Sequence, residues 1–146
     1  MIAFVPQETD TFCFPACLES FFAENEYLIS QREIIARASD IFCDGDQLGG
    51  LAPAKISLIG KVFDLEVIHV EEIAVRLPKG ESVFVHLRPE VGGGHFHWVR
   101  LLGMHLNHTF LMDPAHEHCP RKIETNAFFP LVNLAFHVKL KPMKSE

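Results

Sequence analysis

The spacing of apolar residues changes near the middle of this chain, and that change limits the fold more than any other feature. In the first half, apolar residues recur at helical spacing, whereas in the second half they form short runs rich in β-branched residues. We expect helices from Cys13 to about Phe22, from the capping box at Ser30–Glu33 to about Ala38, and from Ala52 to Phe63. We expect strands over residues 66–70, 82–87, 95–103, 109–112 and 134–140. Helices followed by antiparallel strands indicate an α+β fold with helices packed against one sheet.

Length and composition predict a single globular domain spanning residues 1–146. No apolar run approaches the roughly 18 residues of a membrane span. The first residues lack the basic and long apolar regions of a signal peptide, so we expect a cytoplasmic protein with reduced cysteines. The net charge of −6 offers no basic stripe for phosphates, so nucleic acid is not an expected partner.

Four residues have the chemistry that catalysis by a thiol nucleophile requires, and they occur in the order Gln7, Cys13, His97, Asp113. Cys13 stands at the expected start of a helix, where unpaired N–H groups and the helix dipole favour a thiolate. His97 can accept the thiol proton, and a carboxylate such as Asp113 can fix the imidazole tautomer. The amide of Gln7 can join the Cys13 backbone N–H in holding an oxyanion during acyl transfer.

A second histidine lies on the same strand face as His97. Alternation along the expected strand places His95, His97, Val99 and Leu101 on one face, so spacing alone does not decide which histidine is the base. Three glycines just before this strand, Gly92–Gly94, allow a ligand or another backbone segment to approach closely.

The residues around these four positions resemble the papain-like bacteriocin-processing peptidases, the double-glycine leader peptidases and their standalone relatives. The resemblance covers about residues 4–115. It rests on Gln7-x5-Cys13, Pro15-Ala16-Cys17-Leu18, His97-Trp98-Val99 in a strand ending at Gly103, and Asp113-Pro114, with similar stretches at residues 58–67 and 83–88.

The resemblance implies a papain-like fold in which a helical lobe carrying the cysteine packs against an antiparallel sheet carrying the histidine and aspartate. It implies a cysteine peptidase, or a related acyl-transfer enzyme, that acts without a cofactor on a peptide or protein substrate, a leader peptide included. Carried over, Gln7 is the oxyanion donor, Cys13 the nucleophile, His97 the base and Asp113 the orienting carboxylate.

The sequence departs from the family at the nucleophile, where Phe12-Cys13-Phe14 replaces the usual Asp-Cys-Gly. A bulky Phe14 would narrow the substrate cleft, to which we also assign Phe12, Gly94 and His95. These aromatic residues leave open a second function, a peptide-binding module of the same fold that has lost turnover.

A third alternative is a metal-binding protein that uses His116, His118 and Cys119, with His105 and His108 nearby. Imidazole and thiolate are suitable ligands for zinc or copper. The spacing matches no standard zinc finger, so we expect no metal site.

Overall fold

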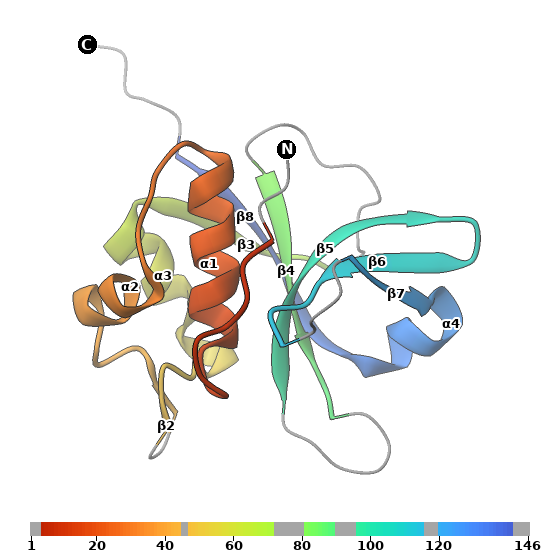
Figure 1. The fold of residues 1–146 in the computed structure, drawn as a ribbon, viewed down its shortest axis with the longest axis horizontal. Coiled ribbons are helices and arrows are strands. Elements are labelled where there is room, and N and C mark those ends of the chain that lie inside the picture. The colour runs from red at the N-terminus through yellow and green to blue at the C-terminus, as the bar shows by residue number, and fades with distance from the viewer. Residues whose placement is uncertain (1–3, 45–46, 72–80, 90–95, 116–119, 142–146) are drawn as a thin grey trace.

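The computed structural model describes residues 4–44, 47–71, 81–89, 96–115 and 120–141. Within these ranges, three helices precede all strands of a six-stranded antiparallel sheet, which confirms the predicted α+β fold. In Figure 1 the helices α1, α2 and α3 gather on one side of the long strands, and the hairpin of β5 and β6 extends toward the other side with β7 and α4. We call residues 4–63 the helical half and residues 65–141 the sheet half.

The three helices of the helical half lie close to their expected positions. They are α1 (Cys13–Glu24), α2 (Gln31–Arg37) and α3 (Ile56–Phe63). Ser30 caps α2 as the capping box predicts, because its side-chain oxygen accepts a hydrogen bond of 3.1 Å from the backbone N–H of Glu33. The helix expected from Ala52 begins instead with a 3₁₀ turn, η1 (Pro53–Lys55), and becomes α-helical only at Ile56.

The strands of the sheet half pair in the order β3-β8-β4-β5-β6-β7, and every neighbouring pair is antiparallel. Their bounds are β3 (Leu65–His69), β4 (Glu81–Leu87), β5 (His97–His105), β6 (His108–Met112), β7 (Arg121–Glu124) and β8 (Val132–Leu140). The last strand therefore inserts between β3 and β4.

Several short elements have no counterpart among the expected ones. They are the two-stranded ribbon β1 (Cys43–Asp44) and β2 (Gln47–Leu48), the strand β7, the helix α4 (Thr125–Phe128) and the 3₁₀ turn η2 (Phe129–Leu131).

Each face of the sheet buries its own group of apolar side chains. Toward the helices, an aromatic cluster includes Phe14 of α1, Phe84 of β4 and Trp98 of β5, with ring centroids 5.0 Å apart for Phe14 and Trp98. On the opposite face, Val99 of β5 packs in a second cluster with Phe128 of α4. Successive residues of β5 thus point to opposite faces, as strand geometry requires.

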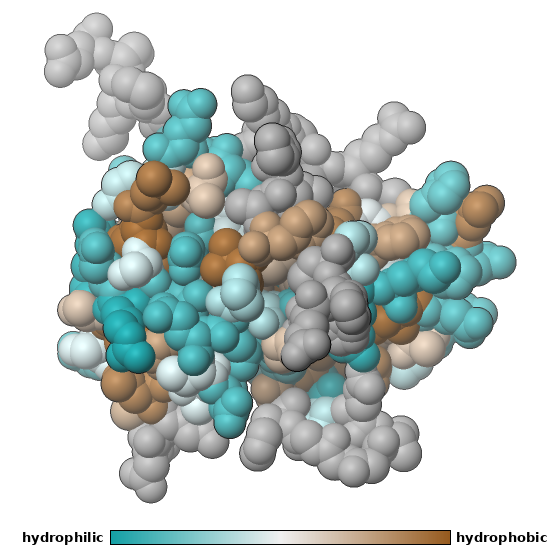
Figure 2. Space-filling view, in the orientation of Figure 1, coloured by the Kyte–Doolittle hydropathy of each residue, from teal (hydrophilic) through white to brown (hydrophobic). Residues whose placement is uncertain are grey.

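The outer surface of the helical half is mostly hydrophilic in the view of Figure 2, with smaller hydrophobic patches between the polar side chains. The apolar faces of the helices are therefore directed mainly toward the sheet. Among the described residues, no helix combines the length and the apolar character needed to cross a bilayer.

Candidate functional site

Cys13 is the first residue of α1, and 8% of its surface is exposed to solvent. No side chain in the described part of the chain caps this end of the helix, where Phe12 is the N-cap residue. The first N–H groups of an α-helix lack partners within the helix, and the positive end of the helix dipole lies there. The sulfur of Cys13 therefore lies where negative charge is electrostatically favoured.

His97 and Asp113 come together because β5 and β6 are antiparallel neighbours. His97 is the first residue of β5, Asp113 directly follows β6, and Arg100 of β5 is opposite Met112 of β6. In this register the start of one strand lies beside the end of the other. The Nε2 atom of His97 and the Oδ1 atom of Asp113 share a short hydrogen bond.

Burial and the neighbouring residues Asp113 and Cys13 set the protonation of His97. Burial lowers its pKa, but hydrogen bonds with Asp113 and with Cys13 raise it, and the result is a pKa of about 9. Because Asp113 occupies Nε2, the Nδ1 atom is the ring nitrogen left for the thiol. His97 thus lies between Asp113 and Cys13, and its pKa is above neutral pH.

The carboxylate of Asp113 also accepts hydrogen bonds from Ala115 and from Arg121. The backbone N–H of Ala115 donates to Oδ1 at 3.0 Å, and Nη1 of Arg121 donates to Oδ2 at 2.9 Å. Burial raises the pKa of Asp113, but the bonds from His97, Arg121 and Ala115 outweigh it and bring the pKa to about 2. Asp113 is therefore ionised throughout the range in which proteins are usually folded.

Sequence reasoning did not identify Arg121 as part of this site. Arg121 lies beside Asp113 because it opens β7, which pairs with β6 so that Arg121 faces Leu111. Since β7 itself was not expected, no local sequence signal connected Arg121 with Asp113.

Gln7 lies next to the same site. Its backbone N–H donates to the carbonyl of Pro114 at 3.0 Å, which places it one residue from Asp113. Its side-chain Nε2 donates to the carbonyl of Thr9 at 2.9 Å, and the same carbonyl accepts the N–H of Phe12 at 3.1 Å. The Gln7 amide is thus connected to the turn that leads into Cys13.

The two phenylalanines that flank Cys13 are buried. Phe14 is 1% exposed, with its ring packed against Phe84 and Trp98. Phe12 is 4% exposed and packs against Gly49, where a Cβ atom would lie 2.5 Å from the Phe12 ring. The expectation that Phe14 narrows an open cleft is therefore not supported by its position, because it faces the core. Gly94 and His95, also assigned to the cleft, lie outside the described residues.

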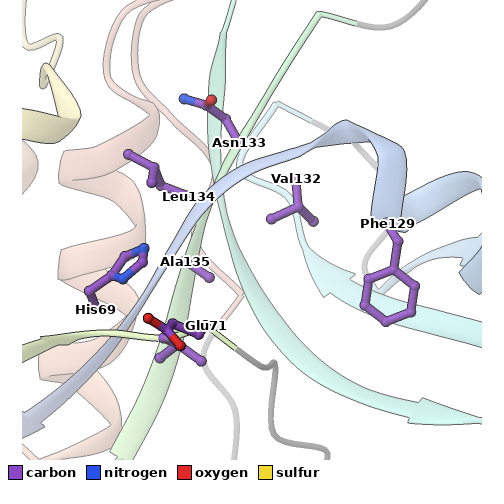
Figure 3. A pocket seen from close by; sticks show the side chains of 8 residues that line it. His69, Glu71, Phe129, Val132, Asn133, Leu134 and Ala135 are labelled. Carbon is purple, nitrogen blue, oxygen red and sulfur yellow. The ribbon is translucent and has the colours of Figure 1, made fainter.

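One hollow among the described residues does not involve these side chains. It measures about 710 Å³ and is lined by His69, Val70, Glu71, Phe129, Val132, Asn133, Leu134 and Ala135. Figure 3 shows these side chains along β8, the turn before it and the end of β3. None of the four candidate catalytic residues is among them.

Within the described part of the chain, no group of three or more His, Cys, Asp and Glu side chains could hold a metal ion. His105 and His108 lie opposite each other across β5 and β6. His116, His118 and Cys119 lie outside the described residues.

Comparisons with solved structures identify the fold. The peptidase domain of Streptococcus ComA, a bi-functional ABC transporter involved in a quorum sensing pathway, matches with a TM-score of 0.76 at 17% identity, over 97% of this chain and 100% of that one. The peptidase domain of Streptococcus mutans ComA matches with a TM-score of 0.62 at 17% identity, over 92% of this chain and 97% of that one. A Bacillus anthracis protein described as a C39-like peptidase matches with a TM-score of 0.67 at 15% identity, over 98% of this chain and 96% of that one.

Sequence comparison alone finds less. No family model matches the chain, and no curated protein matches it. The resemblance noted in the sequence is thus supported by shape over nearly the whole chain. The chain has the α+β fold of the C39 peptidase domains.

Proposed function

We propose that this protein is a cysteine peptidase, or a closely related thiol hydrolase, that cleaves a peptide or amide bond. The observation that carries the proposal is the position of His97, which shares a hydrogen bond with Asp113 and lies close enough to Cys13 for that residue to raise the pKa of His97. A thiol, an imidazole and a carboxylate linked in this order form the triad of a nucleophilic cysteine enzyme.

The proposed reaction begins with attack of the Cys13 sulfur on the substrate carbonyl carbon, while His97 holds the thiol proton. The carbonyl oxygen becomes an oxyanion that accepts hydrogen bonds from the Cys13 backbone N–H and from the Gln7 side-chain amide. When the tetrahedral intermediate collapses, the carbon–nitrogen bond breaks and His97 donates its proton to the leaving amine. The remaining product is a thioester on Cys13.

Hydrolysis of the thioester completes the cycle. His97, now neutral, accepts a proton from water as the water oxygen attacks the thioester carbonyl. Collapse of the second intermediate releases a carboxylic acid and returns the Cys13 sulfur beside a protonated His97. Throughout both steps, Asp113 keeps the imidazole oriented and Arg121 holds Asp113 in place.

A peptide is the substrate class that the fold favours, since the solved neighbours are peptidase domains. A leader peptide belongs to this class. Amidases and acyl transferases can use the same thioester intermediate, so a peptide library is the appropriate first substrate.

The proposal is tested by comparing Cys13 with Cys17. Both belong to α1, but Cys17 is fully buried, donates to the carbonyl of Trp98 at 3.6 Å and has a pKa raised by burial. We expect Cys13→Ala to abolish cleavage of a mixed peptide library, and Cys17→Ala to retain it in whatever fraction remains folded. Iodoacetamide at pH 6, followed by peptide mapping, should label Cys13 before every other cysteine.

Two results would contradict this assignment. Equal loss of activity in folded Cys13→Ala and Cys17→Ala would show that Cys13 is not the special thiol. An unreactive Cys13 in a wild-type protein that binds peptides without cleaving them would instead establish a binding module.

A further inference from the structure

Gln31 forms hydrogen bonds with the backbone on both sides of Gln7. It is the first residue of α2 and is 1% exposed. Its Oε1 atom accepts a hydrogen bond of 3.0 Å from the backbone N–H of Glu8, and its Nε2 atom donates to the carbonyl of Pro6 at 2.9 Å. Pro6 and Glu8 are the two neighbours of Gln7.

The partners of Gln31 also fix which way its amide points. Nε2 donates to Oε1 of Glu19 at 3.1 Å as well as to Pro6. A carboxylate and a carbonyl can only accept, whereas the N–H of Glu8 can only donate, so all three partners require the same orientation. Glu19 belongs to α1, so this one side chain links α1, α2 and the segment before α1.

The segment from Val5 to Gln7 has no regular secondary structure of its own. Besides the two bonds from Gln31, the backbone N–H of Gln7 bonds to Pro114. A donor to an oxyanion acts only if it is held within a fraction of an ångström of its productive position. Bonds to both neighbours, from a buried side chain on a helix, restrict the backbone of Gln7 in the way such a donor needs.

We propose that Gln31 is the positioning residue for the oxyanion donor Gln7. This inference rests on the proposed function and adds a residue that does not touch the substrate. Gln31 acts through the backbone on either side of Gln7, and Glu19 keeps its amide in the orientation that does so.

The test is a double-mutant cycle between Gln31→Met and Gln7→Ala. Methionine has a side chain of similar length but cannot form the hydrogen bonds to Pro6, Glu8 and Glu19. Gln7→Ala removes the donor itself and should lower kcat by about 10²–10³-fold. We expect Gln31→Met to lower kcat by about 10-fold or more with little change in KM, and to cost nothing further in the Gln7→Ala background.

Asn25→Ala is the matched control. Asn25 donates from its side-chain amide to the carbonyl of Phe21 at 2.8 Å and follows α1 at the end opposite Cys13. Like Gln31→Met, the Asn25→Ala variant loses a hydrogen bond from a side-chain amide to the backbone. A general loss of stability would therefore appear in both variants. Asn25→Ala should keep the wild-type kcat.

A second readout separates this inference from the proposed function. Iodoacetamide reacts with a thiolate without forming an oxyanion, so the alkylation rate of Cys13 should be unchanged in Gln31→Met. Amide hydrogen exchange at Glu8 should accelerate in the same variant, because that N–H loses its acceptor.

Each outcome has a definite meaning. Losses that multiply in the double variant, or a kcat in Gln31→Met equal to that of wild type, would overturn the role of Gln31 while leaving the triad intact. A wild-type protein that neither cleaves peptides nor alkylates at Cys13 would remove the proposed function, and this inference with it.

Discussion

At the scale of single residues, the charge on His97 connects the site to the stability of the protein. His97 has a pKa of about 9 against an ordinary value of 6.5, and Asp113 a pKa of about 2 against 3.8. A raised histidine pKa contributes stability that is complete below pH 6.5 and lost as pH rises toward 9. A lowered carboxyl pKa contributes stability that is complete above pH 3.8 and lost as pH falls toward 2. The pair therefore stabilises the fold most between about pH 4 and 6.5.

We predict that, in a protein whose Cys13 is replaced by alanine so that only the imidazole titrates, the free energy of unfolding falls between pH 6.5 and 9 by at most about 3 kcal/mol more than it does when His97→Gln is added. The reason is that folding binds a proton at His97 in this range, which the variant cannot do. Urea titrations at several pH values measure the difference. Asp113→Asn should remove most of this dependence of the free energy of unfolding on pH. If the pH dependence were unchanged in both variants, the ion pair between His97 and Asp113 would be contradicted.

At the scale of elements, the turn between α3 and β3 depends on close contact at Gly60. Asp64 ends α3 in the left-handed conformation, with φ of 58°, and the chain then turns back along the helix. A Cβ atom at Gly60 would lie 2.7 Å from the backbone oxygen of Leu65. Backbone cannot move aside as a flexible side chain can.

We predict that Gly60→Ala destabilises the fold by about 1–3 kcal/mol because it forces α3 and β3 apart. Helix propensity alone gives the opposite sign, since alanine is favoured over glycine by about 1 kcal/mol within a helix. Ser57→Ala, at an exposed position of the same helix, is the control and should change stability by less than about 0.5 kcal/mol. Chemical denaturation measures both, and a stabilised Gly60→Ala would refute the close contact.

How well each element could be predicted depended on whether its cause was local. The cap at Ser30 and the β-branched run of β4 each depend on residues that are close together in the sequence. For this reason α2 and β4 were predicted nearly to their ends. By contrast, β7 consists of Arg121-Lys122-Ile123-Glu124 and exists because it pairs with β6. A short, charged segment of this kind carries no local strand signal.

The same distinction applies to the candidate site. Gln7, Cys13, His97 and Asp113 could be selected by residue type and chain order, and the structure places Asp113 beside His97. Arg121 and Gln31 could not be selected, because their contacts arise from strand register and helix packing. Phe14 was expected to line the substrate cleft because it adjoins Cys13 in the sequence, but its side chain is buried in the core. One step along a helix turns the side chain by about 100°, so neighbouring residues point in different directions.

At the scale of the whole molecule, the proposed triad exists only where the two halves meet. Cys13 belongs to the helical half, whereas His97 and Asp113 belong to the sheet half. Arg100 of β5, 3% exposed, joins the halves through two hydrogen bonds to Glu24 of α1, at 2.9 and 2.7 Å. The same guanidinium also bonds to Ser20 of α1 and to Ser82 of β4. Arg100 thus fixes α1 on β5, the strand that begins at His97.

We predict that Arg100→Met lowers the free energy of unfolding by about 3–5 kcal/mol, because it removes an ion pair and two hydrogen bonds from the largely buried carboxylate of Glu24. Arg100→Met combined with Glu24→Met should recover much of this loss, since both charged members of the pair are then replaced by apolar side chains. Lys141→Met is the control, because Lys141 pairs with Asp64 at 3.4 Å where both side chains are largely exposed, and such pairs contribute at most about 1 kcal/mol. Urea denaturation measures all three, and iodoacetamide labelling of Cys13 reports whether the two halves still meet. If Arg100→Met were no more costly than Lys141→Met, the contact between α1 and β5 would have to depend on the aromatic cluster alone.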